Sequence, residues 1–208
     1  MLTARQVTCV RDDRVLFADL SFQVKEGELV QIEGPNGSGK TSLLRILTGL
    51  LSQDEGEILW HGEPIRTVRD EYHHSLLFLG HQTGVKRDLS VLENLRFYAQ
   101  ISPSSKTDDA SILDAILRVG LAGYEDVLAS HLSAGQQRRI ALARLWLSEH
   151  ALWILDEPLT AIDKRGISVL ETLFLDHAQR GGSIILTSHQ DLFQGNSTLR
   201  RIVLGATQ

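Results

Sequence analysis

Cysteine is nearly absent from this sequence, because Cys9 is the single thiol in 208 residues. One thiol excludes an internal disulfide framework and is typical of a protein from a reducing compartment. The alternation of the neighbouring residues places Cys9 on an N-terminal strand. We therefore expect it to be a small packing residue there.

Long apolar runs are missing as well. A membrane-spanning helix needs roughly 20 mainly apolar residues, and the longest candidate, residues 140–147, is interrupted by Arg144. Residues 1–5 lack the apolar core of a secretory signal peptide. We therefore expect a cytosolic chain that reaches a membrane only through a partner.

An excess of positive charge is also lacking, because the formal net charge is -5. This balance gives no general reason to expect nucleic-acid binding, although it leaves room for a local basic patch. The 42% apolar and 23% charged residues are ordinary for a globular protein. The length suits a single domain, residues 1–208, with an inserted helical subdomain at about 83–150.

The most informative stretch is the motif Gly-Pro-Asn-Gly-Ser-Gly-Lys-Thr at residues 34–41. An apolar, strand-like run at 29–33 precedes it, and the apolar positions of residues 42–47 repeat at helical spacing. Strand, glycine-rich loop and helix in this order are the context that a phosphate-binding loop requires. A glycine-rich turn that binds nothing is the alternative, but Lys and Thr at their two required positions favour a nucleoside triphosphate site.

Each residue type of this motif has a physical role in holding phosphate. The glycines permit positive φ, so the loop can turn its N–H groups toward a polyphosphate at the helix N-terminus. Lys40 adds a full positive charge at the β- and γ-phosphates, and the Thr41 hydroxyl can ligate Mg²⁺. The expected nucleotide-binding residues of this loop are Gly34, Pro35, Asn36, Gly37, Ser38, Gly39, Lys40, Thr41 and Ser42.

The strand patterns predict an α/β fold. Residues 1–30 and 56–62 alternate like half-buried strands and predict an antiparallel sheet beside the nucleotide core. Continuous apolar runs at 76–80, 151–155 and 183–187 predict buried strands. Because helical patterns separate these runs, we expect a mostly parallel sheet.

Helical patterns occupy most of the remaining chain. Residues 85–132 predict a helical lobe of which the second helix is capped by Thr107 or Asp108. Residues 133–148 are expected to form one helix and residues 167–179 another.

Two acidic residues, Asp156 and Glu157, end the predicted strand at 151–155. At the carboxyl end of a parallel strand Asp156 faces the phosphate loop, and we expect it to hold Mg²⁺ directly or through water. Glu157 is then placed to polarise the attacking water, a base role that a metal ligand performs poorly. Paired acids also occur in plain turns, but the preceding phosphate loop favours the functional interpretation.

Two further polar residues follow predicted strands. His189 comes just after the run at 183–187, where a neutral imidazole can contact the γ-phosphate and orient the water. Gln82 follows the run at 76–80 and can reach the metal or the water. A lone histidine at a strand end is more often structural, so both hypotheses depend on the motifs around them.

The segment Ser133-Ala134-Gly135-Gln136 is a second candidate phosphate site, at the start of a predicted helix. Ser133 is a helix N-cap candidate, and the small residues after it allow backbone to approach a ligand closely. An ordinary capped helix is the alternative. One nucleotide cannot readily use two distant helix N-termini of one fold, so we expect this one to serve a neighbouring copy of the chain.

In order and across nearly the whole chain, these motifs resemble the set found in ATP-binding-cassette ATPases. The resemblance implies a P-loop NTPase domain with an N-terminal antiparallel β-subdomain and an inserted helical lobe that docks a membrane subunit. It also implies a head-to-tail homodimer that holds two ATP molecules, each between one copy's phosphate loop and the other's residues 133–136. The catalytic residues implied are Lys40, Gln82, Glu157 and His189, the metal ligands Thr41, Gln82 and Asp156, and the D-loop aspartate Asp163.

A narrower resemblance is to the ATP-binding subunit of the cytochrome c maturation haem exporter. It is carried by residues 72–74, 80–86, 92–95, 132–147, 152–158, 160–163 and 188–190. The resemblance implies integral-membrane partners and a peripheral position on the cytoplasmic face of the bacterial inner membrane. It also implies that ATP hydrolysis drives haem export or the release of a haem-loaded periplasmic chaperone. A subunit of another transporter, moving a lipid, peptide or metal, and a soluble cassette protein acting on ribosomes or DNA are the alternatives.

Two positions depart from the usual family pattern. Ala134 takes the place of the usual second-position glycine of the signature segment 133–136, as it does in the haem-exporter group. Arg11 stands where many cassettes place an aromatic residue that stacks on adenine, and an arginine plane can also stack on a base. Phe17 is a nearby aromatic candidate, but core packing is the favoured interpretation.

The remaining histidines do not suggest a haem site in this chain. His73 and His74 are adjacent and would point to opposite faces of a strand, which is unsuited to one shared iron. Solvated or core positions are expected for His61, His73, His74, His81 and His131, so haem would be met only through partners. We expect Arg138 and Arg139 to be interface or solvated charges and not nucleic-acid contacts.

Overall fold

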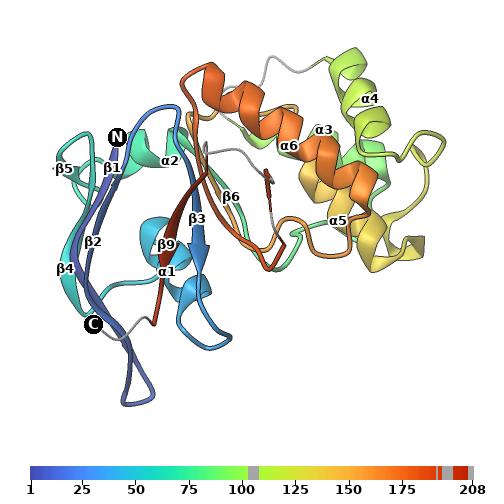
Figure 1. The fold of residues 1–208 in the computed structure, drawn as a ribbon. Coiled ribbons are helices and arrows are strands. Elements are labelled where there is room, and N and C mark those ends of the chain that lie inside the picture. Colours follow the sequence, from blue (N-terminus) through green and yellow to red (C-terminus); the bar gives the residue numbers. More distant parts are fainter. Residues whose placement is uncertain (103–107, 191, 194–198, 206–208) are drawn as a thin grey trace.

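The computed structural model describes residues 1–102, 108–190, 192–193 and 199–205. Figure 1 shows an antiparallel sheet that holds the N-terminus, a parallel sheet beside it, and a group of helices beyond the parallel sheet. This arrangement confirms the predicted α/β fold with an N-terminal β-subdomain and a helical insertion.

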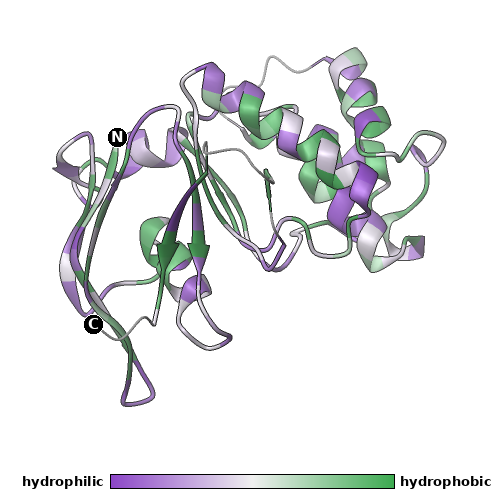
Figure 2. Cartoon of the chain, viewed as in Figure 1, coloured by the Kyte–Doolittle hydropathy of each residue, from purple (hydrophilic) through white to green (hydrophobic). Residues whose placement is uncertain are grey.

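The antiparallel sheet has the strand order β2-β1-β4-β5. Its strands are Leu2–Arg11 (β1), Arg14–Val24 (β2), Glu55–Trp60 (β4) and Glu63–Pro64 (β5). Asp12 and Asp13 connect β1 to β2 with φ angles of 49° and 59°, a left-handed pair that suits the twist of a two-residue hairpin. Figure 2 shows the tip of this hairpin as hydrophilic. Residues 1–30 thus form hairpin strands as predicted, but β1 is buried at consecutive residues, 2–4 and 7–9, and is therefore covered on both faces, whereas β2 is mostly exposed.

The second sheet has the order β6-β7-β8-β3-β9, and all of its strand pairs are parallel. Its strands are Leu29–Glu33 (β3), Leu76–Leu79 (β6), Leu152–Leu155 (β7), Ser183–Thr187 (β8) and Leu199–Val203 (β9). The sequence predicts all of these strands except β9. Because the strands run in one direction, their carboxyl ends meet at one edge of the sheet, and the motifs follow those ends.

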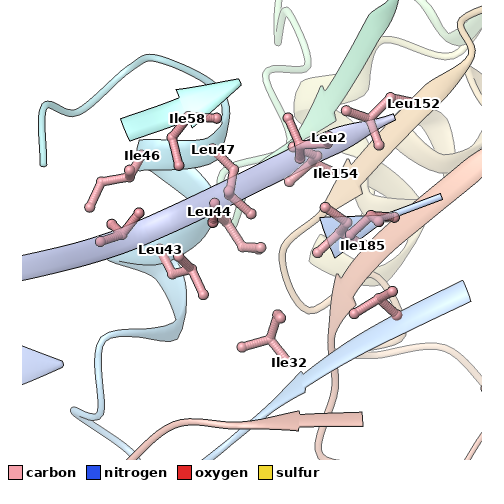
Figure 3. Close-up of a cluster of buried hydrophobic side chains, with 14 of the residues drawn as sticks. Leu2, Ile32, Leu43, Leu44, Ile46, Leu47, Ile58, Leu152, Ile154 and Ile185 are labelled. Atoms are coloured by element: carbon pink, nitrogen blue, oxygen red, sulfur yellow. The ribbon is translucent and has the colours of Figure 1, made fainter. Parts of the chain in front are cut away.

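Helix α1, Lys40–Leu47, packs its apolar face against both sheets. This face consists of Leu43, Leu44, Ile46 and Leu47. Figure 3 shows it among Leu2 of β1 and Ile154 of β7, which belong to the same buried cluster. Each fully buried leucine stabilises the fold by roughly 2 kcal/mol. Gly49 ends the helix as expected, with φ 74° and its N–H donated to the Ile46 carbonyl.

Three helices lie between β6 and β7 in the sequence and share a core of their own. They are Val91–Ile101 (α3), Asp109–Arg118 (α4) and Ala134–Ala143 (α5), with a short 3₁₀ turn at Ala129–His131. Asp108 caps α4, because its Oδ1 accepts the Ser111 N–H at 2.8 Å. The other predicted cap, Thr107, lies outside the described residues. In the described part of the chain, no helix has the length and apolar character needed to cross a bilayer.

Helix α6, Lys164–Gln179, packs against β7 and β8 through a third cluster that includes Phe174 and Trp153. The sequence predicts its start at Ile167. The helix begins three residues earlier because Asp163 is the N-cap and accepts the Gly166 N–H at 3.0 Å.

Helix α5 ends at Ala143, so the prediction of one helix over residues 133–148 is wrong. The N–H groups of residues 144–147 are donated to carbonyls three residues back, which tightens the chain into 3₁₀-like turns. These turns place Leu145 in the buried cluster around Trp153. Tertiary packing therefore decides where this helix ends.

His73 and His74 lie on a short helix, Arg69–His74 (α2), so their assignment to a strand is wrong. His73 Nε2 is 3.3 Å from the Thr48 carbonyl oxygen. His74 Nδ1 is 2.6 Å from the Asp70 carbonyl oxygen. The two rings are therefore held by different backbone carbonyls, which is a structural reason why they do not share one ligand.

Candidate active site

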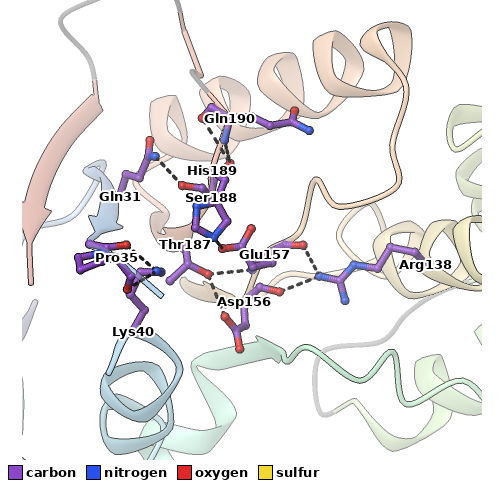
Figure 4. A network of polar contacts seen from close by, with 11 residues as sticks. Gln31, Pro35, Lys40, Arg138, Asp156, Glu157, Thr187, Ser188, His189 and Gln190 are labelled. Carbon is purple, nitrogen blue, oxygen red and sulfur yellow. Dashed lines mark hydrogen bonds and ion pairs between the residues drawn. The ribbon is translucent and has the colours of Figure 1, made fainter. Parts of the chain in front are cut away.

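The glycine-rich loop at residues 34–39 joins β3 to α1. Lys40 Nζ donates to the Gly34 carbonyl at 2.7 Å and to the Pro35 carbonyl at 3.2 Å, so its ammonium lies against the inside of the loop (Figure 4). Ser38 Oγ is buried and has no hydrogen-bond partner within the described residues. A phosphate oxygen would satisfy this orphan hydroxyl and the lysine together, so the loop fits the polyphosphate that the sequence predicts.

The three glycines of the loop all have positive φ, at 149° for Gly34, 81° for Gly37 and 94° for Gly39. A Cβ on Gly34 would lie 2.6 Å from Ser38 Oγ and 2.7 Å from the Leu204 carbonyl oxygen. A Cβ on Gly37 would meet nothing within 4 Å. Gly34 is therefore required by close packing as well as by its backbone conformation.

The acidic pair after β7 is fixed by one hydroxyl at the end of β8. Thr187 Oγ1 donates to Asp156 Oδ1 at 2.9 Å and accepts the Glu157 N–H at 2.8 Å (Figure 4). Asp156 is 2% exposed and Thr187 is 0% exposed. The Asp156 carboxylate is therefore held in a defined orientation, which a metal ligand needs.

Glu157 and His189 are in contact at the carboxyl edge of the parallel sheet. Their side chains approach to 3.4 Å between His189 Nε2 and Glu157 Oε1. The Glu157 side chain is 20% exposed and the His189 side chain 60% exposed. Glu157 has a φ of 50°, a conformation that side-chain-bearing residues rarely adopt and that concentrates at functional sites. An acceptor and an imidazole side by side can both contact one water molecule that lies next to the pair.

A cavity of about 490 Å³ opens at this edge of the sheet. Thr41, Gln82 and Asp156, the three predicted metal ligands, all line it. Hydroxyl, amide and carboxylate oxygens are the hard ligands that Mg²⁺ prefers. The residues present therefore fit an Mg²⁺ ion next to the phosphate loop, where the ion would neutralise phosphate charge.

The second predicted phosphate site, residues 133–136, is not part of this cavity's lining. Ser133 Oγ accepts the Gln136 N–H at 3.2 Å, and Gln136 Oε1 accepts the Ser133 N–H at 2.9 Å, so the two residues form a capping box. A Cβ on Gly135 would lie 3.3 Å from the Ala161 carbonyl oxygen, which makes a small residue necessary there. The N-cap is as predicted, and the binding of nucleotide by Ser133, Ala134, Gly135 and Gln136 of a second copy stays a prediction.

Arg138 is not an interface or solvated charge, so that prediction is wrong. It is 6% exposed and donates to the carbonyl oxygens of Gly80, Asp156 and Glu157. Burial lowers its pKa, an effect that the nearby acidic side chains Asp156 and Glu157 oppose. Sequence reasoning missed this contact because the acceptors are backbone atoms far away in the chain.

Arg139 and Asp163 form an ion pair at 3.2 Å. Backbone N–H donation from Gly166 lowers the pKa of the Asp163 carboxyl, and the Arg139 charge lowers it further. Asp163 therefore remains ionised as the N-cap of α6 and connects that helix to α5.

Arg11, the candidate for adenine stacking, lies near the end of β1. Its guanidinium donates to the Val10 and Ser52 carbonyl oxygens and pairs with Asp54 at 3.5 Å. Base stacking by Arg11 stays a prediction. Phe17 is 8% exposed and belongs to the core cluster, which confirms its packing role.

The motif set has clear relatives among known proteins. A family model described as "ABC transporter" matches residues 17–160. The protein named "Cytochrome c biogenesis ATP-binding export protein CcmA" of Aliivibrio fischeri is 62% identical over 205 residues, covering 99% of this chain and 100% of the relative. Proteins of the same name are 61% identical in Vibrio cholerae, covering 99% of both chains, and 58% identical in Yersinia pestis, covering 100% of this chain and 94% of the relative.

Solved structures share the same fold. CbiO1 of Clostridium perfringens, described as part of the ABC transporter complex cbiONQ, has a TM-score of 0.70 at 26% identity and covers 91% of this chain and 78% of its own. The cassette MJ0796, solved as a dimer bound to ADP and Pi, has a TM-score of 0.77 at 23% identity and covers 91% of this chain and 88% of its own. With the phosphate loop, the acidic pair and the capped signature helix in place, the chain belongs to the ATP-binding-cassette transporter ATPases.

Proposed function

We propose that this chain is the ATP-hydrolysing subunit of a membrane complex for cytochrome c maturation, in which hydrolysis drives haem export or the release of a haem-loaded periplasmic chaperone. The observation that carries the proposal is the full-length identity of 62% to a CcmA protein, together with a complete set of ATPase motifs. The subunit would lie on the cytoplasmic face of the inner membrane through integral-membrane partners.

The reaction is in-line attack by water on the γ-phosphate. Glu157 accepts the proton of the attacking water, and His189, 3.4 Å from it, orients that water and the γ-phosphate. Lys40 and the N–H groups of the loop stabilise the charge on the transferred phosphoryl group. Thr41, Asp156 and Gln82 would hold an Mg²⁺ ion, which would supply electrostatic stabilisation of the phosphate charge.

A homodimer completes each site. Ser133 and Gln136 cap the start of α5 away from the cavity that holds Thr41 and Asp156. The helix N-terminus at Ser133 is therefore free to bind the γ-phosphate of a nucleotide on a second copy. ATP closes the two copies together, and the helical lobe passes this motion to the membrane partner through residues 83–100.

Replacement of Glu157 by Gln tests the catalytic assignment. Glu157→Gln keeps the shape of the side chain but removes the base, so ATP binding is retained while turnover falls about 1,000-fold. ATP-bound dimers should accumulate in gel filtration. Wild-type turnover in this variant would remove Glu157 from its role.

Mixed dimers test the shared site. One copy carries Ser133→Ala and the other carries Lys40→Ala, with different affinity tags for isolation. In the head-to-tail arrangement both substitutions act on the same pocket, so the other pocket keeps all of its groups and hydrolysis continues there. The control is a dimer of one wild-type and one Lys40→Ala copy, which should keep activity at one pocket. If this control is active and the doubly substituted mixed dimer is completely inactive, the head-to-tail arrangement is contradicted.

Co-purification from native membranes tests the partners. Crosslinks from residues 83–100 to haem-handling membrane proteins support cytochrome c maturation. Crosslinks to a permease for a lipid, peptide or metal would assign the ATPase to another transporter.

A further inference from the structure

Arg138 sits in the second turn of α5, the helix that begins at the signature residue Ser133. Its guanidinium points to the carboxyl edge of the parallel sheet, between the ends of β6 and β7. Nη1 donates to the Gly80 carbonyl oxygen at 2.9 Å. Nη2 donates to the carbonyl oxygens of Asp156 and Glu157, at 2.8 Å each (Figure 4). The Arg138 side chain therefore connects three segments: its own helix α5, the segment after β6 and the segment after β7.

Each of these segments carries a group of the proposed reaction. Gly80 is two residues before Gln82, and Asp156 and Glu157 are the acidic pair. Ser133, five residues before Arg138 on the same helix, faces a second copy in the proposed dimer. Arg138 is thus a direct connection between the surface that meets the partner copy and the residues that act on water and metal.

The contact with Glu157 bears on a strained residue. Glu157 has a φ of 50°. Its N–H is held by Thr187 Oγ1 at 2.8 Å, and its carbonyl is held by Arg138 at 2.8 Å. A left-handed residue with a side chain persists only where its surroundings hold it from both sides. Loss of Arg138 would release one of these two restraints.

Stability alone is a poor explanation for this arginine. Its charge is buried, burial lowers its pKa, and its Nε has no hydrogen-bond partner within the described residues. Burying a charge with an unsatisfied donor is costly. The planar fork, however, reaches carbonyls at the ends of two strands at once, which a lysine ammonium does with less geometric definition.

We propose that Arg138 is a positioning residue for ATP hydrolysis: it holds the backbone of Glu157 in its left-handed conformation and couples the signature helix to Glu157 and to the segment that carries Gln82. Docking of a second copy at Ser133 is thereby transmitted to the groups around the attacking water. The inference rests on the proposed role of Glu157.

The test compares Arg138→Gln and Arg138→Lys in the full-length protein assembled with its membrane partners. Nucleotide-binding sites are counted first, so that kcat refers to folded protein. We expect kcat to fall by about tenfold or more in Arg138→Gln, because a misplaced base loses much of its effect. KM for ATP should stay within about twofold, because Arg138 contacts no group of the phosphate loop. Arg138→Lys, which keeps the charge but not the fork, should recover part of the loss.

Arg5→Gln is the matched control. Arg5 lies on β1 and pairs with Glu57 of β4 at 2.6 Å on the exposed surface of the antiparallel sheet, outside residues 83–100, so its loss should leave kcat and KM unchanged. A purely structural role for Arg138 would reduce the number of folded sites and leave kcat per site at the wild-type value, and that result overturns the inference. If Arg138→Gln does not fold, Arg138→Lys alone tests the inference. A wild-type kcat per site in Arg138→Lys would then overturn it.

Glu157→Gln, measured in the same assay, distinguishes a failure of the proposed catalytic role of Glu157 from a failure of the proposed positioning role of Arg138. If Glu157→Gln retains turnover, the proposed role of Glu157 fails. If Glu157→Gln is inactive while Arg138→Gln turns over normally, only the inference about Arg138 fails.

Discussion

Thr187, the last residue of β8, donates a hydrogen bond of 2.9 Å from its Oγ1 to Oδ1 of Asp156, the residue directly after the neighbouring strand β7. The same hydroxyl accepts the N–H of Glu157 at 2.8 Å. A single buried oxygen on β8 therefore orients the predicted metal ligand and the predicted base at the end of β7. The register of the two strands, which pairs Leu155 with Leu186, brings these residues together.

Replacement of Thr187 by Val tests this relationship. Valine keeps the shape but removes the hydroxyl, which leaves the partly buried Glu157 N–H without its acceptor. We expect the free energy of unfolding to fall by about 1–3 kcal/mol, and kcat to fall by about tenfold or more. Thr187→Ser keeps the hydroxyl and loses one methyl, so it should cost about 1 kcal/mol and retain most of kcat. Urea unfolding and steady-state ATPase assays measure both effects, and equal kcat in the two variants would contradict the role of the hydroxyl.

Lys40→Ala separates nucleotide binding from folding. Among the described residues, the ammonium donates hydrogen bonds to the Gly34 and Pro35 carbonyls alone, so the free energy of unfolding without nucleotide should change by less than about 1 kcal/mol. Hydrogen bonds to charged groups contribute about 1.5–3 kcal/mol, so ATP affinity should fall by roughly 10- to 150-fold. Titration with a fluorescent ATP analogue gives the affinity. An unchanged dissociation constant would contradict the phosphate-loop assignment.

Gly34→Ala and Gly37→Ala form a matched pair in the same loop. Both positions have positive φ, but only at Gly34 would the new Cβ lie within 2.7 Å of a backbone carbonyl oxygen, that of Leu204. We expect Gly37→Ala to lower the free energy of unfolding by about 1 kcal/mol, and Gly34→Ala by about 2 kcal/mol or more because strain and a steric clash add. Thermal unfolding measures the difference. Equal losses would show that the loop relaxes away from Leu204.

His177 should make the stability of the fold depend on pH. Its ring stacks on Trp153 with centroids 3.7 Å apart, and burial, assisted by the Arg180 charge, lowers its pKa to about 4. The unfolded chain binds a proton at His177 near pH 6.5. The stability from the neutral ring is therefore complete above about pH 6.5 and is lost as the pH falls toward 4, by at most about 3 kcal/mol.

His177→Phe keeps a stacked ring and removes the titration, so urea unfolding at pH 5 and at pH 7.5 should differ less than in the wild type. A smaller dependence of the unfolding free energy on pH remains, because burial also lowers the pKa of His150, which lines one surface cavity together with His177. His131→Gln removes an exposed histidine as a control. If the difference in unfolding free energy between pH 5 and pH 7.5 is the same in His177→Phe as in the wild type, His177 is excluded as the source of the pH dependence.

The most local features were the ones that could be predicted. The phosphate loop, the buried strands and the acidic pair depend on neighbouring residues, because a glycine, an apolar run or a cap acts over a few positions. The position of Glu157 and of His189, each directly after a buried strand, could also be predicted, whereas their mutual contact was not. Errors arose where local patterns were ambiguous, as for His73 and His74, and where packing set a boundary, as at the end of α5.

The amino-acid sequence by itself determined the class of this protein, because the spacing of its glycines, lysine and carboxylates has meaning only around a triphosphate. Only the tertiary structure decided which side chains hold those groups in place. Thr187 and Arg138 both contact Asp156, although Thr187 is separated from it by 31 positions in the sequence and Arg138 by 18. Such contacts depend on strand order and on the packing of α5 against the sheet, and no pattern of neighbouring residues specifies them.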